Sequence, residues 1–165
     1  MNILRPILED DLDQMFVWRN SRVIMARTRQ SRILSWKEHI AWYNNLDMNK
    51  DLMYAIEKGG MFVGVCGITN IDYINRSGEL SIYVGDESNY RKGIATKALE
   101  ELKNIFFNDL NLYRFWAEVY SFNTLMICFL EANGFENEAF LKKTVFKNGQ
   151  YCDSYYFSCF DLEKS

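Results

Sequence analysis

The segment NYRKGIATKALEEL, residues 89–102, places two cations and a glycine directly before a run with helical spacing. The free backbone N–H groups in the first turn of a helix, together with the helix dipole, attract anions. Gly93 would let a ligand approach the backbone closely, and Arg91 and Lys92 add positive charge. The pattern predicts a phosphate-binding turn. It also fits a solvated helix start with a simple bend, because one glycine falls short of a P-loop or a GxGxxG motif.

Residues 19–32, RNSRVIMARTRQSR, carry the strongest charge asymmetry of the chain. They include five of its nine arginines and no acidic residue. Guanidinium groups suit phosphate because they bond two oxygens at once, so a diphosphate-linked sugar is a natural ligand for such a cluster. A polyamine would be repelled by it. RNA phosphates would attract the same side chains, and a solvated helix end and loop would also account for them.

His39 is the only histidine of the chain, and it lies three positions from both Trp36 and Trp42. On a helix this spacing brings the three rings near one face. A lone histidine among aromatic residues favours a packed side chain with satisfied hydrogen bonds. Its place beside the arginine-rich segment also makes His39 a candidate acceptor contact or general base.

The hydrophobic pattern predicts two helices near the start of the chain. NILRPIL reads as a first strand, and Asp10 or Asp11 caps a helix with apolar residues at helical intervals. Ser35 starts the second helix, and Glu38, three residues later, completes a capping box. These helices would carry the arginine-rich segment between them.

The pattern then changes to the alternation of strands. It predicts a hairpin from LMYAIEK and MFVGVCGITNI, a strand from GELSIYVG, and a helix from Gly93 to Phe107. A strand YRFWAEVY, a short helix that ends near Gly134, and a terminal hairpin that turns at Asn148-Gly149 complete the chain. This order of elements indicates an α+β domain with a mixed sheet.

Length and composition set further bounds. The 165 residues, 48% of them hydrophobic, can bury one core, and no linker or repeat divides them, which predicts a single domain over residues 1–165. We expect a cytoplasmic protein without membrane contact, because no apolar run could span a bilayer and the first residues do not resemble a signal peptide. The net charge of -3 argues against general nucleic-acid affinity.

The cysteines form no CxxC pair, so we expect reduced thiols in the core and no metal site. The run LMICFL around Cys128 is too apolar to stabilise a thiolate, which argues against a nucleophile there. The four cysteines are Cys66, Cys128, Cys152 and Cys159.

The strand ELSIYVG, the segment NYRKGIATKAL, a further strand and a short helix ending in GF resemble the GNAT superfamily of acetyl-CoA-dependent N-acyltransferases over nearly the whole chain. Gly93 and Ala95 match the small positions of its phosphate motif Q/R-x-x-G-x-G/A, whereas Tyr90 departs from it. The resemblance implies a mostly antiparallel sheet of about seven strands flanked by about four helices. It implies acetyl-CoA as cofactor, bound by Ile82, Tyr83, Val84, Arg91, Lys92, Gly93, Ile94, Ala95, Thr96 and Asn123.

A second family pattern, N-x-x-A-x-x-x-Y-x-x-x-G-F, maps onto Asn123, Met126, Leu130, Gly134 and Phe135. In many relatives the tyrosine of this pattern protonates the departing thiolate, and leucine cannot. The acid is therefore another residue or water, or the thiolate leaves unassisted. The tyrosines of the terminal hairpin that could replace it are Tyr151, Tyr155 and Tyr156.

The resemblance also implies direct transfer to an amine, with Glu79 of the central strand as the general base. An exposed strand position is the alternative for Glu79. WRN at residues 18–20, followed by SWKEHIAWY, resembles the branch that acetylates nucleotide-linked amino sugars, such as the pseudaminic-acid pathway enzyme. Ribosomal-protein N-terminal alanine acetyltransferases and polyamine acetyltransferases are also similar. For a primary amine of a nucleotide sugar, the substrate-binding residues would be Arg19, Asn20, Arg22, Trp36 and His39.

Two other classes of function stay open. Leu130 and the imperfect phosphate motif also fit a module that binds acetyl-CoA without catalysis. The arginines also fit an RNA-associated interaction module, whose binding would depend steeply on salt. Strand exchange at the terminal hairpin is one route to a homodimer.

Overall fold

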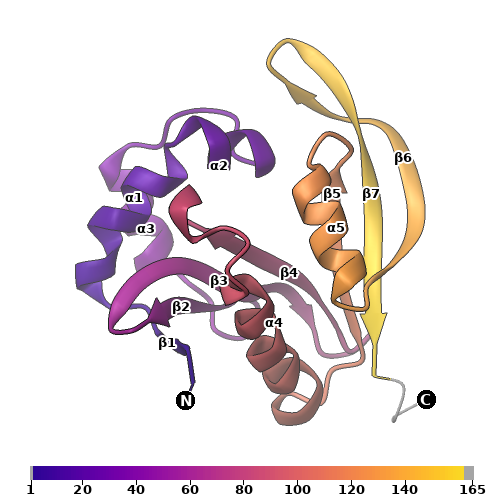
Figure 1. The fold of residues 1–165 in the computed structure, drawn as a ribbon, viewed down its shortest axis with the longest axis horizontal. Helices are drawn as coiled ribbons and strands as arrows, with labels where there is room; N and C mark the ends of the chain where they lie inside the picture. Colours follow the sequence, from indigo (N-terminus) through magenta and orange to yellow (C-terminus); the bar gives the residue numbers. More distant parts are fainter. Residues whose placement is uncertain (1, 162–165) are drawn as a thin grey trace.

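The computed structural model describes residues 2–161, and a single sheet of seven strands runs through them (Figure 1). The strand order is β1-β2-β3-β4-β5-β7-β6, and every neighbouring pair is antiparallel except β4 and β5, which are parallel. The strands are β1 (Leu4–Pro6), β2 (Leu52–Lys58), β3 (Met61–Asp72), β4 (Ser77–Val84), β5 (Arg114–Tyr120), β6 (Glu136–Lys147) and β7 (Gln150–Phe160).

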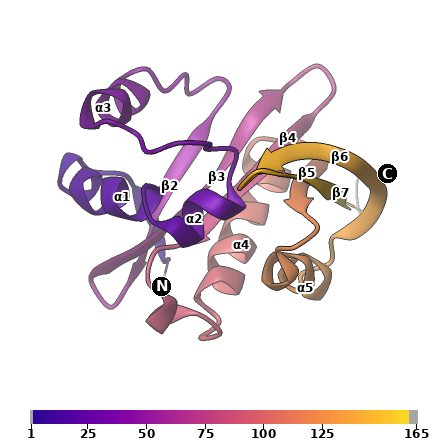
Figure 2. The same cartoon turned by 90° about the horizontal axis from the view of Figure 1, so that it is seen from above.

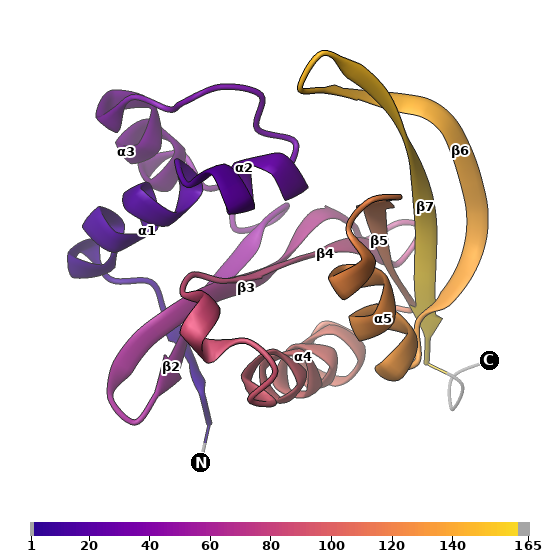
Figure 3. The ribbon, with the colours of Figure 1, turned by 45° about the horizontal axis from the view of Figure 1, so that its top comes forward.

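Helices cover both faces of this sheet. They are α1 (Leu12–Arg19), α2 (Arg22–Arg27), α3 (Trp36–Asn44), α4 (Ile94–Asn104) and α5 (Thr124–Ala132), and a π turn at Ile105–Asp109 extends α4. Figures 2 and 3 show α4 and α5 on one side of the sheet and α1, α2 and α3 on the other. The larger hydrophobic core lies beneath α4 and α5, and a smaller one lies beneath α1. The predicted α+β class with a mixed, mostly antiparallel sheet is therefore confirmed.

Two predictions that depend only on residues close together in the sequence are confirmed. The Ser35 hydroxyl accepts a hydrogen bond from the Glu38 N–H, and the Glu38 carboxylate accepts one from the Ser35 N–H, which is the predicted capping box. The terminal hairpin turns at Asn148 and Gly149, whose φ angles of 51° and 80° suit these two residue types.

The helix α2 was not predicted, because the arginine-rich segment shows no apolar period. The Ser21 hydroxyl caps it by accepting from the Ile24 N–H, and Ile24 is its one buried residue. A short helix anchored by a single apolar side chain leaves too weak a pattern to read from the sequence. In residues 2–161, no helix is long and apolar enough to cross a membrane.

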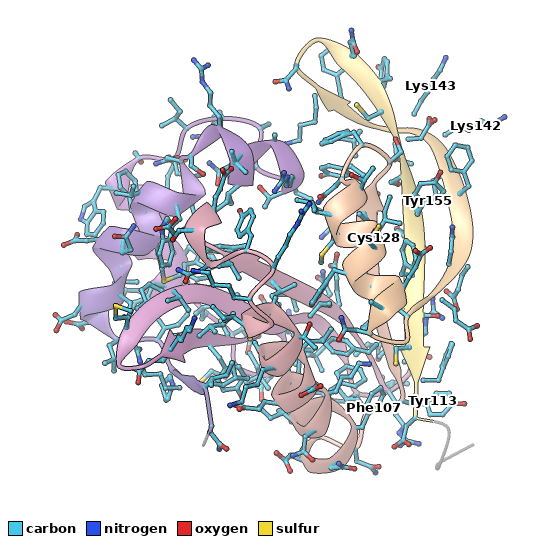
Figure 4. The ribbon with its side chains drawn as sticks, viewed as in Figure 1. Phe107, Tyr113, Cys128, Lys142, Lys143 and Tyr155 are labelled. Carbon is cyan, nitrogen blue, oxygen red and sulfur yellow. The ribbon has the colours of Figure 1, made fainter. Side chains whose placement is uncertain are left out.

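The burial of the cysteines agrees only in part with the expectation that they are core thiols. Cys66 is buried, Cys152 and Cys159 are half-buried, and all four cysteines are free. Cys128 is exposed on α5 (Figure 4), so its assignment to the core was wrong. The apolar run around it misleads because α5 buries Leu130, two residues later, on its other face.

The strands β4 and β5 are paired over only a short stretch. The paired residues are Ser77 with Arg114, Gly78 with Phe115, and Glu79 with Trp116. Beyond Glu79, β4 stays paired with β3 as far as Val84, and β5 stays paired with β7 as far as Tyr120. The two strands separate there (Figure 3), and one edge of Leu80–Val84 has no strand partner in the described chain.

Asp11 ties the first strand to the start of α1. Its carboxylate accepts hydrogen bonds from Arg5 Nη1 at 2.7 Å, from Arg5 Nη2 at 2.9 Å and from the Leu8 N–H at 2.8 Å. Only 6% of Asp11 is exposed. Hydrogen bonding to Arg5 is the largest of the contacts that lower the pKa of Asp11 below its usual range.

We predict that Asp11→Asn lowers the free energy of unfolding by about 2 kcal/mol near neutral pH, because it removes a charge from a partly buried ion pair. The folded-state pKa of Asp11 is lowered, so this stabilisation is present above the unfolded-state value of 3.8 and is lost as the pH falls through the folded-state value. Urea denaturation of wild type and variant at about pH 7 and about pH 3 should show the difference shrinking in acid.

The matched control is Asp13→Asn, a substitution at an exposed position of α1. It should change the free energy of unfolding by less than about 0.5 kcal/mol. Equal effects of the two substitutions, or a difference that grows in acid, would contradict the role of Asp11.

Candidate functional site

A cavity of about 630 Å³ lies between β4 and β5, where the two strands separate. It runs from the N-terminus of α4, along the unpaired edge of β4, to a group of charged side chains where the two strands separate. Leu125, Met126 and Phe129 of α5 form its apolar wall. The predicted site residues that line it are Glu79, Ile82, Tyr83, Val84, Arg91, Gly93, Ile94, Ala95, Thr96 and Asn123.

The N-terminus of α4 forms one end of the cavity. Gly93 is its N-cap residue, with a left-handed φ of 73°, and no side chain caps the helix. The N–H groups of the first turn therefore have no acceptor within the helix. A Cβ at Gly93 would meet no atom within 4 Å, so the space before the turn is open. Arg91 lines the cavity, whereas Lys92 is exposed beside it. This end has the free donors and the positive charge that a diphosphate requires.

The middle of the cavity offers backbone groups and one free amide. The edge of Leu80–Val84 that faces the cavity can pair with an extended ligand as a strand would. Asn123 is the N-cap residue of α5, but its side chain does not cap the helix. The Asn123 amide is therefore available to a ligand beside the apolar wall.

Two carboxylates and one guanidinium form the other end. Arg29 Nη2 lies 2.6 Å from Glu79 Oε1 and 3.2 Å from Glu118 Oε2, and Arg29 Nη1 lies 3.0 Å from Glu79 Oε2. The hydrogen bonds to Glu79 are the largest cause of a raised pKa of Arg29. Glu79 is buried, which excludes the alternative of an exposed strand residue.

Sequence reasoning missed both Arg29 and Glu118 as members of this group. Glu118 lies on β5, far from Glu79 in the sequence, and only the short parallel pairing of the two strands brings them together. Alternation along YRFWAEVY shows that Glu118 shares a face with Trp116, but it does not reveal the neighbouring strand.

Tyr120, the last residue of β5, also lines the cavity. Only 5% of it is exposed, and no hydrogen-bond partner is found for its hydroxyl within residues 2–161. Burial raises its pKa, which keeps the hydroxyl protonated at neutral pH. Leu130, which occupies the family's tyrosine position, is fully buried in the core and lies outside the cavity.

The tyrosines of the terminal hairpin do not reach the cavity. Tyr155 lies on β7, between Phe140 and Phe157, where Figure 4 shows it beyond α5. Tyr151 is exposed, and Tyr156 packs against the ring of Trp116. None of these three candidates for a replacement acid lines the cavity, whereas Tyr83, Tyr90 and Tyr120 do.

His39 is fully buried and lies outside the cavity. Its Nε2–H donates to the Leu12 carbonyl oxygen at 2.9 Å, and its Nδ1 accepts from Arg19 Nη1 at 3.3 Å. Burial is the largest cause of its lowered pKa, so the ring is neutral. The roles of general base and acceptor contact are contradicted, because every hydrogen-bonding atom of the ring is already used inside the protein.

The other predicted acceptor contacts are scattered. The Asn20 side chain holds the loop after α2 by accepting from the Leu34 N–H, and Trp36 packs edge-on against Phe16. Neither these residues nor the exposed Arg22 lines the cavity. Only Arg19 faces a hollow, a smaller cavity of about 250 Å³ that adjoins the first.

The arginine-rich segment does not form the positive cluster that its sequence indicates. Arg29 is paired with two carboxylates, and Arg32 is paired with Glu38. Arg27 lines the large cavity together with Tyr90, near the N-terminus of α4. Because these charges are separated and partly neutralised, the argument that the segment would repel a polyamine fails.

Comparison with known proteins adds to this geometry. Residues 2–136 match the family model "Acetyltransferase (GNAT) domain". The chain is 33% identical over 101 residues to an N-acetyltransferase named p20 from Bacillus licheniformis, a match that spans 61% of this chain and just over half, 56%, of that protein. It is 27% identical over 150 residues to spermidine N(1)-acetyltransferase of Escherichia coli strain K12, covering 90% of this chain and 80% of that one.

Solved structures share the fold. A spermidine N-acetyltransferase from Vibrio cholerae, in complex with CoA and spermine, superposes with a TM-score of 0.85 at 24% identity and covers 95% of this chain and 94% of that one. A dodecameric structure of the same kind of enzyme from that organism gives 0.83 at 23% identity, covering 98% and 96%. These named proteins lend no support to a pseudaminic-acid or ribosomal-protein branch.

We predict that Gly93→Ala weakens coenzyme A binding at least about tenfold, because a methyl group would enter the open space before the free N–H groups of α4. Isothermal titration calorimetry with coenzyme A measures the dissociation constant. Thermal unfolding without ligand should show only the modest loss expected for alanine at a positive φ.

Gly149→Ala is the matched control for Gly93→Ala. Gly149 also has a positive φ, 80°, and open space around its Cβ position, but it lies in the terminal hairpin. It should lose similar stability and keep the affinity for coenzyme A. Equal loss of affinity in both variants would show that backbone strain, rather than the turn, is responsible.

Proposed function

Because the chain belongs to the GNAT acetyltransferase family, we propose that it transfers an acetyl group from acetyl-CoA to a primary amine of a polyamine such as spermidine. The family match confirms the predicted acetyl-CoA-dependent N-acetyltransferase. The observation that carries the proposed acceptor is the pair of carboxylates, the buried Glu79 and the half-buried Glu118, at the end of a cavity whose other end is the uncapped N-terminus of α4.

The residues along the cavity fit coenzyme A in their chemistry. The N–H groups of Ile94, Ala95 and Thr96 would hold the diphosphate, with Arg91 adding charge. The unpaired edge of β4 would bind the pantetheine arm, and the Asn123 amide lies on the opposite wall. Acetyl-CoA, when bound, supplies an acetyl thioester that is activated toward an amine.

Two side chains at the far end of the cavity would move the protons. Glu79, directly or through water, would accept the proton that the amine nitrogen loses as its bond to the acetyl carbon forms. Tyr120 would donate its proton to the sulfur as the carbon–sulfur bond breaks. Backbone N–H groups around Ile82 would stabilise the negative charge that develops on the carbonyl oxygen. This assignment needs no covalent enzyme intermediate.

The charges near the transfer point support a cationic acceptor. Three carboxylates line the large cavity, those of Asp51, Glu79 and Glu118, and the two glutamates already hold a cation, the Arg29 guanidinium. The relative from Escherichia coli is named a spermidine acetyltransferase, and one structural neighbour holds spermine. Both features favour a polyamine over the nucleotide-linked amino sugar expected from the sequence.

A nucleotide-linked amino sugar is the second candidate acceptor, and one observation favours it. The Arg19 guanidinium lines the smaller cavity, where it stacks 4.8 Å from the Trp42 ring and bonds His39. Arg19 has no carboxylate partner in the described part of the chain. Such a cation could bind a phosphate of the acceptor.

Three further predictions from the sequence are retained as proposals. A single acetyltransferase domain over residues 1–165 is supported by the one sheet that joins Leu4 to Phe160. A homodimer would bury the edge of β6, where Phe140 and Phe146 are exposed. A cytoplasmic location agrees with acetyl-CoA as cofactor.

We predict that the protein, mixed with acetyl-CoA and spermidine, releases free thiol and yields a polyamine heavier by one acetyl group. Thiol release followed in parallel with a nucleotide-linked amino sugar and a peptide with an N-terminal alanine tests the acceptor, and mass spectrometry identifies the product. Glu79→Gln should lower kcat with spermidine by roughly 100-fold, because a neutral amide cannot accept the proton.

Turnover with the nucleotide sugar alone would show that the acceptor is an amino sugar and not a polyamine. Turnover with the peptide alone would support a ribosomal-protein acetyltransferase. Binding of acetyl-CoA without thiol release from any amine would favour a non-catalytic module.

We predict that Tyr120→Phe lowers kcat by roughly tenfold or more and changes the KM for acetyl-CoA by less than about twofold, because it removes a proton donor and keeps the ring. Initial rates with each substrate varied give both constants. Tyr151→Phe removes an exposed hydroxyl of the hairpin and should match wild type. An unchanged kcat in Tyr120→Phe would transfer the acid role to water.

A further inference from the structure

Arg29 reaches Glu79 and Glu118, at the charged end of the large cavity, from a loop outside the sheet. It lies in the loop after α2, whose C-cap residue is Thr28, and its guanidinium spans the gap between β4 and β5. Its side chain is 58% exposed, whereas the side chains of Glu79 and Glu118 are 7% and 13% exposed. The cation therefore covers one buried and one half-buried carboxylate from the solvent side.

The two carboxylates are held from behind by neutral groups. Asn70 Nδ2 donates to Glu79 Oε2 at 2.6 Å, and the Ser154 hydroxyl donates to Glu118 Oε1 at 2.8 Å. The Ser154 hydroxyl also bonds the Thr144 hydroxyl at 2.7 Å. Each carboxylate therefore has a side-chain hydrogen bond that does not depend on Arg29.

Arg29 is the only cation that contacts either carboxylate in residues 2–161. The carboxylates of Glu79 and Glu118 carry like charges, lie close together and are largely removed from water. They therefore need a counter-ion at all times. An ammonium group of the acceptor can also supply this positive charge. The reactive amine also has to approach Glu79 from the space that the guanidinium fills.

We propose that Arg29 is a displaceable counter-ion, which occupies the acceptor position at Glu79 and Glu118 until a polycationic amine replaces it. This inference rests on the proposed function and refines its substrate class. Arg29 lines both the large and the small cavity, so its departure would enlarge the space beside Glu79. Its exposed side chain and its place in a loop give it room to turn outward.

The exchange also sets a minimum charge for the acceptor. The nitrogen that attacks must be neutral, so it cannot balance the carboxylates. A second, protonated nitrogen of the same molecule can do so after Arg29 has left. A diamine or polyamine satisfies both conditions, whereas a monoamine leaves Glu118 without a counter-ion once its only nitrogen has lost a proton.

The experiment measures spermidine binding to the coenzyme A complex by calorimetry, which needs no turnover, and the KM for spermidine in the thiol assay. Arg29→Gln should tighten the dissociation constant and lower the KM by about fivefold, which corresponds to about 1 kcal/mol, because the internal competitor is gone. Arg29→Lys keeps the charge but cannot bridge two carboxylates, so its constants should lie between those of wild type and Arg29→Gln.

Arg32→Gln is the matched control, since Arg32 belongs to the same segment but pairs with Glu38 outside both cavities. It should bind spermidine like wild type. Weaker or unchanged binding in both Arg29→Gln and Arg29→Lys, with thermal unfolding showing that they fold, would overturn the proposal and leave Arg29 a positioning residue for Glu79. Equal rates with propylamine and a diamine in wild type would overturn the charge requirement.

Failure of the inference is distinguishable from failure of the proposed function. Wild type that acetylates spermidine, without the tightening in Arg29→Gln, contradicts the inference alone. Wild type that neither binds spermidine in the calorimeter nor acetylates it contradicts the proposed acceptor.

Discussion

The separation of β4 from β5 is the constraint on which the rest of the site depends. The two parallel strands share three residue pairs and then diverge, so backbone groups that would have paired with each other face a cavity instead. Unpaired backbone groups are costly unless water or a ligand satisfies them. The divergence is stable because β4 keeps its antiparallel partner β3, and β5 keeps β7, over the length of the gap.

The same divergence determines where charge accumulates. Glu79 is paired with Trp116, so Glu118, two residues further along β5, lies on the same face of the sheet. Tyr120 follows on that face after two more residues, while Phe115, Ala117 and Val119 face the core. One face of the diverging strands therefore holds the ionisable groups and the other holds the fold together. Arg29 can satisfy both carboxylates only because the strand register has brought them within the span of one guanidinium.

The sequence predicts the structures that depend on neighbouring residues and fails where distant segments meet. Ser35 and Glu38 identify a helix start, and Asn148-Gly149 identifies a hairpin turn, because each acts within a few residues. Gly93 was found because the turn and the helix after it are continuous in the chain. The pairing of Arg29 with Glu79 was not foreseeable, since it needs the position of α2 above a sheet whose strand order the sequence does not contain. The arginines were therefore counted as a cluster although the fold separates them.

The proposed proton donor, Tyr120, shows how far a family motif can be carried over. Leu130 occupies the motif's tyrosine position, and in this chain it packs with Phe135 in the core beneath α5. The thiolate needs a proton donor near its sulfur, and the donor can come from any element that lines the cavity. Tyr120 enters from β5, the wall that also carries Glu118. Because proton transfer depends on distance and pKa, a hydroxyl on another strand can replace the one that the helix lacks, provided that burial keeps it protonated, as it does for Tyr120.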